Sequence, residues 1–327
     1  MLPDVTQPLS REAAADAFAA ILDGKYPDEE VGPFLVALND RGETADEIAA
    51  AAREMRARMV AIEAPADAID VCGTGGDGSH SLNVSTAVAL VVAAAGTPVA
   101  KHGNRAASSR AGAADTLEAL GLDLDIAEKT AERSLAELGI AFLFAARHHP
   151  ALGRLGPLRR ALGRRTIFNL LGPLCNPAGV RRQLIGVPSP AYVETHIAAL
   201  KTLGAERAMA VHGEEGLDEI SICGPSRIAT LSGGDIARDR ITPEAAGLPA
   251  HNRDAIRGGD AAFNAQALRK LLAGERSAYR DAVLMNAAGA LIVADAAGTW
   301  HDGAERAAEA IDSGRAAALL DRWIAFR

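Results

Sequence analysis

Asp70-Val71-Cys72-Gly73-Thr74-Gly75-Gly76-Asp77-Gly78 is a stretch in which an apolar strand ends abruptly in a glycine loop, and a helix-like segment follows the loop. Glycines let backbone N–H groups approach an anion without interference from Cβ atoms. The start of the following helix adds unpaired N–H donors and the positive end of the helix dipole. The stretch therefore predicts a phosphate-binding turn between a β-strand and an α-helix.

Two well-known nucleotide loops fit this stretch poorly. The spacing Gly73-x-Gly75-x-x-Gly78 matches the dinucleotide fingerprint, which also expects an acidic residue about 20 positions later. The chain has Pro98-Val99-Ala100-Lys101 at that distance, so a cation stands where an anion is expected. A Walker loop requires Lys and then Ser or Thr directly after its last glycine, but Ser79 and His80 follow here. We therefore do not favour a bound nucleotide.

The composition is that of an ordinary globular protein. The chain has 327 residues, of which 49% are hydrophobic, 23% charged and 4% aromatic. This length favours about two domains or one large domain with an elaboration. The formal net charge of -8 and the few aromatic residues are unlike a nucleic-acid-binding surface, which usually carries a basic surplus or base-stacking aromatics. We therefore expect no nucleic-acid partner.

The cysteines and the apolar runs indicate a cytoplasmic protein without membrane contact. Cys72, Cys175 and Cys223 are widely spaced and lack a metal-ligand pattern, which is typical of a reduced compartment. Cys72 beside the glycine loop is a possible nucleophile, but no neighbouring His is visible in the sequence, so we favour a packing role. The N-terminus lacks a signal-peptide pattern, and the run Ala87–Ala95 is shorter than the about 20 residues that cross a bilayer.

The pattern of apolar residues divides the chain into a helical domain and an α/β domain. Residues 1–65 show helical spacing, and Thr44 with Glu47 forms a capping box that opens a helix extending to about Met59. From Ile69 onward, short apolar runs alternate with helical patterns, which predicts a mostly parallel sheet. The predicted strands are Ile69–Cys72, Pro98–Lys101, Ala141–Ala145, Gln183–Val187, Arg207–His212 and Ile228–Leu231.

The segment 148–175 interrupts this alternation. It is rich in Arg, Gly and Pro, and it has helical pieces around Leu158–Leu162 and Thr166–Leu171. We expect it to join the helical N-terminal domain, which leaves residues 66–147 and 176–327 as the α/β domain. The predicted fold class is α/β, with a mostly parallel sheet and a smaller all-helical domain.

Polar side chains follow the first two predicted strands. Asn83-Val84-Ser85-Thr86 heads the apolar run that starts at Ala87. A helix cap needs one such residue, so three favour contact with a ligand, and a hydroxyl can also face magnesium. Lys101–Ser109 follows the second strand, where ligands of open α/β sheets gather. Lysine suits a phosphate, although a solvated basic turn is the alternative for this segment.

A carboxylate-rich loop and an arginine-rich helix supply further candidates. Asp218 and Glu219 follow the strand that ends near His212, and on a loop both can reach a cation directly or through water. An exposed acidic loop is the commoner explanation, but a neighbouring phosphate site favours magnesium. Among the arginines of 157–169, Arg159 can bind a carboxylate in two-pronged fashion, and the others fit a solvated face.

Together these residues resemble the anthranilate phosphoribosyltransferase family of tryptophan biosynthesis, whose members join anthranilate to phosphoribosyl pyrophosphate. The likeness follows the family's order through Gly73–Asp77, Asn83–Thr86, Lys101–Ser109, Arg159, Arg165–Asn169, Gly172–Leu174 and Asp218-Glu219. Arg41–Thr44 and Asn286–Ala288 fit more loosely, so it extends over nearly the whole chain. It implies a nucleoside phosphorylase/phosphoribosyltransferase-like fold and a homodimer joined through the helical domain.

The resemblance also implies roles for individual residues. Phosphoribosyl pyrophosphate would be held by Gly73, Gly76, Asp77, Ser81, Asn83, Val84, Ser85, Thr86, Lys101, Asn104 and Ser109. Anthranilate would be contacted by Gly73, His102, Asn104, Arg159 and Pro173, and Mg²⁺ would be held by Ser85, Asp218 and Glu219. No protein nucleophile or general base is expected, because the anthranilate amine attacks, and Lys101 would act electrostatically.

Two positions depart from the family's pattern, and two other functions compete with this interpretation. Ala113 stands where many members carry a serine that touches the phosphoribosyl group, and Leu82 stands where an aromatic residue is frequent. A pyrimidine nucleoside phosphorylase shares a related architecture and a glycine loop, but Lys101-His102-Gly103-Asn104 favours the transferase. A non-catalytic nucleic-acid-binding relative of the fold is opposed by the acidic balance.

Overall fold

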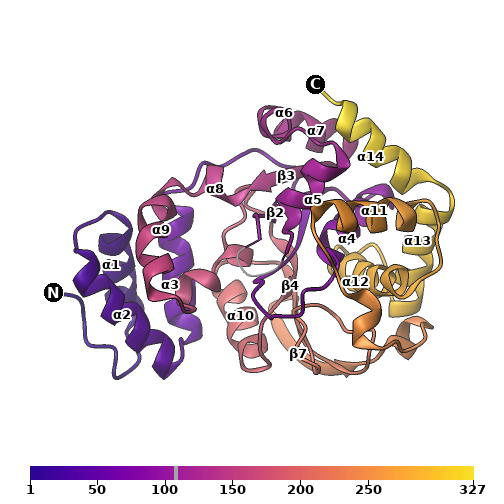
Figure 1. Ribbon diagram of the computed structural model, residues 1–327. Coiled ribbons are helices and arrows are strands. Elements are labelled where there is room, and N and C mark those ends of the chain that lie inside the picture. Colours follow the sequence, from indigo (N-terminus) through magenta and orange to yellow (C-terminus); the bar gives the residue numbers. More distant parts are fainter. Residues whose placement is uncertain (107–109) are drawn as a thin grey trace.

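Three helices form the N-terminal part of the chain in the computed structural model, which describes residues 1–106 and 110–327. They are α1 (Arg11–Leu22), α2 (Asp28–Arg41) and α3 (Ala45–Arg56), at one end of the molecule (Figure 1). The predicted capping box is confirmed, since the Thr44 hydroxyl accepts from the Glu47 N–H and the Glu47 carboxylate accepts from the Thr44 N–H. The helix ends at Arg56, three residues before the predicted end.

A sheet of seven strands forms the centre of the remaining chain, in the order β3-β2-β1-β4-β5-β6-β7. The first five strands are parallel, and the last two are antiparallel to their neighbours. This confirms the mostly parallel α/β sheet, and the six predicted strands lie within two residues of the observed bounds. The strands are β1 (Ile69–Gly73), β2 (Val99–Gly103), β3 (Ile140–Phe144), β4 (Arg182–Gly186), β5 (Arg207–Gly213), β6 (Ser226–Ser232) and β7 (Asp235–Ile241).

Strand β7 was not predicted, because its sequence Asp-Ile-Ala-Arg-Asp-Arg-Ile is dominated by charged residues. It forms the edge of the sheet, and all its residues except Ile241 are exposed or half-exposed. Charged side chains are a common device on edge strands, since they discourage pairing with another chain. The hydrophobic pattern that revealed the other strands is therefore absent here for a physical reason.

Helices cover both faces of the sheet. Alternate residues of the strands supply two separate cores: Val71, Leu184 and Met209 face α4 and the C-terminal helices, whereas Ile185, Ala208 and Ala210 face α10 and the N-terminal helices. The helices after α3 are α4 (Val84–Ala94), α5 (Ala113–Leu120), α6 (Leu124–Lys129), α7 (Ala131–Leu138), α8 (Ala145–His148), α9 (Pro150–Leu162), α10 (Ala191–Thr202), α11 (Ala261–Leu272), α12 (Ala278–Val293), α13 (Trp300–Asp312) and α14 (Arg315–Ala325).

The predicted insertion packs against the N-terminal helices. Helix α9 lies beside α1–α3 in Figure 1, and its Leu155 and Leu158 share a hydrophobic core with Leu35 of α2. The ring of Phe168, in the short 3₁₀ turn after α9, meets Phe18 of α1 edge to face with ring centroids 6.3 Å apart. Helix α9 starts at Pro150 and is therefore longer than the predicted helical piece, which begins at Leu158.

Helix α4 carries the most apolar sequence of the fold, yet it is a core helix. Eleven residues long, it is buried at nine of them and contacts β1, β2, α12, α13 and α14. It begins at Val84 rather than at the predicted Ala87. In the part of the chain that the structure describes, no helix combines the length and the apolar character needed to cross a membrane.

The strand order defines a switch point between β1 and β4. From β1 the chain proceeds through β2 and β3 toward one edge, and from β4 through β5 to β7 toward the other edge. The loops after β1 and β4 therefore diverge at the carboxyl ends of the strands, which is where open α/β sheets bind ligands.

The helical part depends on one buried carboxylate. The Glu47 side chain is fully buried and accepts hydrogen bonds from the Leu9 N–H, the Thr44 N–H and hydroxyl, and the Arg41 guanidinium. Burial alone would raise the pKa of Glu47, but these donors outweigh it and hold the pKa below its usual value. The ionised form therefore stabilises the fold at neutral pH.

We expect Glu47→Gln to lower the free energy of unfolding at pH 7 by about 3 kcal/mol, because it leaves the Arg41 cation without its partner. The loss should shrink as the pH falls from about 4.3, the usual pKa of a glutamate, through the lower folded-state value. Urea unfolding of both proteins at pH 7 and pH 3.5 measures this. An equal difference at the two pH values would contradict the role given to the Glu47 charge.

Candidate functional site

Strands β1 and β4 end in two neighbouring glycines, and Asp218 occupies the space that side chains would fill there. Gly73 and Gly186 are paired in the sheet. A Cβ atom on Gly73 would lie 2.4 Å from an Asp218 carboxylate oxygen, and one on Gly186 would lie 1.6 Å from the Asp218 carbonyl oxygen. Neither position tolerates a side chain while Asp218 stays in place. The loop after β5 is thus brought directly to the switch point.

Hydrogen bonds hold the glycine loop around this carboxylate. The Gly75 N–H donates to the Asp218 carboxylate over 2.7 Å, and the Thr74 N–H donates to the Gly186 carbonyl over 2.9 Å. Gly75 and Gly76 have φ angles of +68° and +73°, a region that residues with side chains rarely adopt. The glycines are therefore required by the turn itself, and the predicted loop follows β1 as expected.

Three carboxylates gather at the loop. Asp77 accepts a hydrogen bond from the Asp218 N–H over 3.3 Å, and Glu219 accepts one from the Ser85 N–H. Burial, with the negative charge of Asp77, raises the pKa of Asp218, and burial with the charge of Asp218 raises that of Glu219. A cation beside them would relieve this cost. Carboxylate and hydroxyl oxygens are also the donors that Mg²⁺ prefers, so these residues fit a magnesium ion.

Lys101 extends its side chain from β2 to the neighbouring strand β1 and to the first turn of α4. Its side chain is buried, with Nζ donating to the Val71 carbonyl over 2.8 Å and to the Ser85 hydroxyl over 3.2 Å. Asp70 on the opposite face of β1 accepts from the His102 N–H over 3.1 Å and fixes the end of β2. The structure thus brings Lys101, Ser85, Asp218 and Glu219 into one connected group.

The N-terminal turn of α4 contains one buried hydroxyl without a protein partner among the described residues. Asn83 occupies the N-cap position, but its side chain makes no capping hydrogen bond. The hydroxyl of Thr86 in the same turn is buried and has no hydrogen-bond partner among the described residues. Such an orphaned polar group needs an explanation, and a ligand at the helix N-terminus provides one.

Two other predicted residues of the loop are engaged by the protein itself. Ser81 pairs in a β-bridge with Arg257. The Asn83 side chain bonds to Ala111, Thr116 and Asn264. Their contact with a substrate stays a prediction.

His102 forms a buried pair with His149. The Nε2 atoms lie 3.3 Å apart, and the His102 Nδ1 atom lies 2.9 Å from the Gly172 carbonyl oxygen, next to Pro173. Burial lowers the pKa of His102 to about 3 and that of His149 to about 4. Both rings are therefore neutral at pH 7, and His102 contacts the residue that directly precedes Pro173.

The structure gives the remaining predicted residues few or no contacts with the rest of the site. Arg159 on α9 is half-buried and makes no hydrogen bond or ion pair with another described residue, and burial lowers its pKa. Asn104 is exposed, and its side-chain oxygen accepts from the Arg105 N–H over 2.8 Å. Ser109 lies outside the described residues.

Sequence reasoning missed residues that hold the loops in place. Asp115 accepts hydrogen bonds from the N–H groups of Ala106 and Gly112, at the two ends of the segment after β2. Arg165 donates to the Gly75 carbonyl over 2.7 Å, which links the helical part to the glycine loop. The position of Asp115 three residues after Gly112 was a visible helix-start signal, whereas nothing in the sequence pointed from Arg165 to Gly75.

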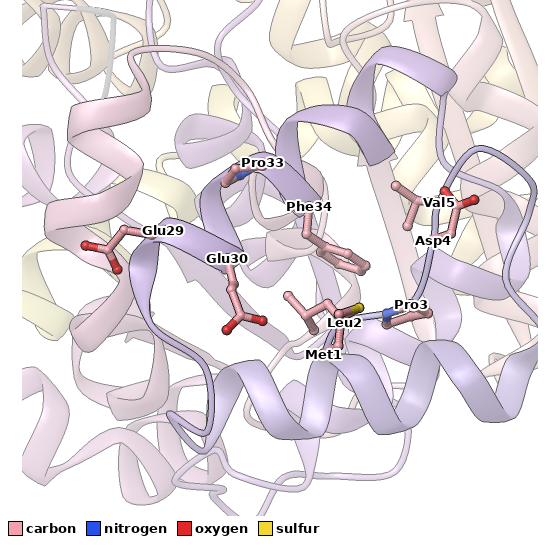
Figure 2. Close-up of a pocket in the computed structure, with 9 residues that line it drawn as sticks. All are labelled: Met1, Leu2, Pro3, Asp4, Val5, Glu29, Glu30, Pro33 and Phe34. Carbon is pink, nitrogen blue, oxygen red and sulfur yellow. The ribbon is translucent and has the colours of Figure 1, made fainter.

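Two pockets among the described residues lie away from this group. Figure 2 shows a surface pocket of about 270 Å³ on the helical part, lined by residues 1–5 together with Glu29, Glu30, Pro33 and Phe34. A second pocket of about 480 Å³ lies beside Arg105, Glu118 and Arg147. Neither pocket is lined by a residue assigned to a substrate or to magnesium. The hydrogen bonds around Asp218 and Lys101, and not a cavity, therefore define the candidate site.

Comparison with known proteins gives one consistent family. Residues 65–317 match the glycosyl transferase family a/b domain, and residues 5–59 match the helical bundle domain of the same family. An anthranilate phosphoribosyltransferase from Novosphingobium aromaticivorans is 64% identical over 325 residues, which cover 99% of this chain and 98% of that protein.

Solved structures of the same kind share the fold. The anthranilate phosphoribosyltransferase of Thermus thermophilus has a TM-score of 0.93 at 42% identity, with 98% of this chain and 97% of that one covered. The Saccharomyces cerevisiae enzyme in complex with phosphoribosyl pyrophosphate and magnesium has a TM-score of 0.89 at 28% identity, with 97% and 93% covered.

We expect Gly186→Ala to lower the free energy of unfolding by about 2 kcal/mol or more, because the new methyl group would collide with the Asp218 backbone. Gly153→Ala is the control, since Gly153 lies inside α9 with no atom within 4 Å of the new Cβ. That change should stabilise the protein by about 0.5–1 kcal/mol. Urea unfolding of both variants measures the effect, and equal stabilities would refute the close approach.

Proposed function

The chain belongs to the anthranilate phosphoribosyltransferase family, and from this membership we propose how its residues bind phosphoribosyl pyrophosphate and anthranilate. The enzyme transfers the phosphoribosyl group to the amine of anthranilate, giving N-(5-phosphoribosyl)anthranilate and pyrophosphate. The observation that carries the proposed site is the Gly75 N–H bond to Asp218, because it joins the glycine loop to the carboxylates at the switch point.

The glycine loop, the first turn of α4 and Lys101 bind phosphoribosyl pyrophosphate in this proposal. The orphaned Thr86 hydroxyl supports a polar ligand at the turn, and the positive φ angles of Gly75 and Gly76 support a loop shaped for close backbone approach. Lys101 supplies a buried cation on the same side. Gly73, Asp77, Ser81, Asn83, Val84, Asn104 and Ser109 complete the proposed set.

Asp218, Glu219 and the Ser85 hydroxyl would hold a magnesium ion together with the diphosphate. No group of three or more His, Cys, Asp or Glu residues within 1–106 and 110–327 could hold a metal by itself. Mg²⁺ usually takes one or two carboxylates together with the phosphates of its substrate. The chemistry that the ion supplies when bound is neutralisation of charge on the departing pyrophosphate.

Catalysis in this proposal is positioning plus electrostatics. As the C1–O bond of phosphoribosyl pyrophosphate breaks, positive charge grows on the ribose and negative charge on the pyrophosphate. Lys101 and the loop N–H groups stabilise the negative charge. The amine of anthranilate is the nucleophile, so no protein base has to activate it. His102 fits this account, since its low pKa makes it a poor proton acceptor.

Arg159, His102 and Pro173 line the proposed anthranilate position. Arg159 is a half-buried cation that has no anionic partner in the described chain, and it could bind the anthranilate carboxylate with two hydrogen bonds. The neutral, buried His102 ring and Pro173 belong to the wall behind this position in the proposal. Gly73 and Asn104 belong to the same proposed position.

Assembly and location are also proposals. We group residues 1–65 with 148–175 as one helical domain, supported by their shared core. We expect this domain to join two copies of the chain into a homodimer, as the family resemblance implies. The three cysteines are free, which supports a cytoplasmic enzyme.

The metal assignment predicts that Asp218→Asn and Glu219→Gln each lower kcat by about 10²–10³, because each removes stabilisation of the departing diphosphate. They should also raise the magnesium concentration needed for half-maximal rate. The decrease in anthranilate fluorescence measures the reaction at varied magnesium. Wild-type rates with an unchanged metal dependence would contradict the assignment.

Arg159→Met should raise KM for anthranilate about tenfold or more, since a charge-assisted contact contributes roughly 1.5–3 kcal/mol. The KM for phosphoribosyl pyrophosphate should stay within about twofold. Arg160→Met is the matched control, because Arg160 is the exposed neighbour on the same helix. Equal effects of the two substitutions would remove Arg159 from the anthranilate position.

A further inference from the structure

Asn83, a residue proposed to contact the substrate, also makes four hydrogen bonds to other parts of the protein. Its amide oxygen accepts from the Thr116 hydroxyl over 2.6 Å and from the Asn264 amide nitrogen over 2.8 Å. Its amide nitrogen donates to the Ala111 carbonyl over 3.2 Å. Its backbone carbonyl accepts from the Tyr279 hydroxyl over 3.0 Å. One residue of the glycine loop is thus tied to α5, α11, α12 and the segment before α5.

Each amide in this group has only one possible orientation. The Gly259 N–H donates over 2.8 Å to the side-chain oxygen of Asn264, and a backbone N–H can only donate. The nitrogen of Asn264 is therefore turned toward Asn83, which must present its oxygen. The nitrogen of Asn83 then faces the Ala111 carbonyl, which can only accept. The side chain of Asn83 is fixed by the groups around it.

The partners of Asn83 are buried and therefore held in place. Thr116 is 0% exposed, Asn264 2% and Tyr279 4%. Without the Thr116 hydroxyl, the half-buried Asn83 side chain would keep one of the two donors to its oxygen, and its position would be less tightly fixed. The group, which we call the Asn83 hub (Asn83, Thr116, Asn264 and Tyr279), therefore acts as a rigid anchor.

The Asn83 hub joins the end of the glycine loop to α5 and α11. Asn83 ends the glycine loop and directly precedes the first turn of α4, which is proposed to bind phosphoribosyl pyrophosphate. The chain before α11 is also paired with the glycine loop, since the Leu82 N–H donates to the Ile256 carbonyl and the Gly258 N–H donates to the His80 carbonyl, both over 2.8 Å. Helices α5 and α11 thus hold the end of the glycine loop and the start of α4 in place.

We propose that Thr116 and Asn264 are positioning residues for phosphoribosyl pyrophosphate, acting through the amide of Asn83. This rests on the proposed role of the glycine loop. Without the Thr116 hydroxyl, the loop spends part of its time away from the binding geometry, and the apparent Kd rises in inverse proportion to the fraction that remains competent. The anthranilate contacts lie on other elements, so the effect should be confined to one substrate.

Thr116→Val, which keeps the shape and removes the hydroxyl, should raise KM for phosphoribosyl pyrophosphate about five- to tenfold. The KM for anthranilate and kcat should change less than about twofold. Thr116→Ser should restore the wild-type value, because it restores the donor. Ser134→Ala is the control, since that hydroxyl is equally buried but bonds to the Ala131 carbonyl in α7. Calorimetric affinity for phosphoribosyl pyrophosphate with magnesium is measured in parallel.

A double-mutant cycle separates positioning from general destabilisation. In an Asn83→Ala background, Thr116→Val should have no further effect on the affinity, because its target is gone. Tyr279→Phe, which removes only a hydroxyl, should shift the affinity in the same direction and serves if Thr116→Val does not fold. An unchanged affinity in folded Thr116→Val, or an equal effect in both backgrounds, would overturn the inference. The calorimetry decides this even if transfer to anthranilate itself is not observed.

Discussion

The close approach of Asp218 to the glycine ends of β1 and β4 is the contact on which the site depends. It places a carboxylate at the switch point of the sheet, where the loops after two central strands diverge and where open α/β sheets bind ligands. The same contact requires glycine at positions 73 and 186 and ties the loop after β5 to the glycine loop. Sheet topology, turn conformation and the proposed metal ligands are thus consequences of one packing constraint.

This constraint has an electrostatic cost. Asp218 and Glu219 are held close to Asp77 with little water, so the pKa values of both are raised. Stabilising groups at functional sites are often arranged at the expense of the fold. Here the cost would be offset by a cation and diphosphate, which would make the carboxylates a better site for the bound state than for the empty one. The buried ammonium group of Lys101 donates to the Val71 carbonyl and the Ser85 hydroxyl.

The sequence predicted much of this arrangement where local signals were strong. The glycine loop, the capping box at Thr44 and six strands all leave patterns of period or composition, and the structure has them. Strand β7 has no such pattern because its side chains face solvent on the edge of the sheet. The bonds of Arg165 to Gly75 and of Asn264 to Asn83 span 90 and 181 positions, and no local pattern records a contact over that distance. Gly186 lies inside the predicted strand Gln183–Val187, and nothing in the sequence marks it as the strand's end.

Two kinds of side chain hold the loops of the site in place: a carboxylate, Asp115, and the uncharged residues of the Asn83 hub. Asp115 joins Ala106 to Gly112, and its charge is balanced by Arg105, which is exposed and removed from the carboxylates of the metal position. Next to the glycine loop, the anchors are an asparagine pair, a threonine and a tyrosine, none of which carries a charge at neutral pH. A carboxylate in the place of Asn83 would add a negative charge to the loop that is proposed to bind the diphosphate. A neutral network fixes the loop without altering the field in which the pyrophosphate departs.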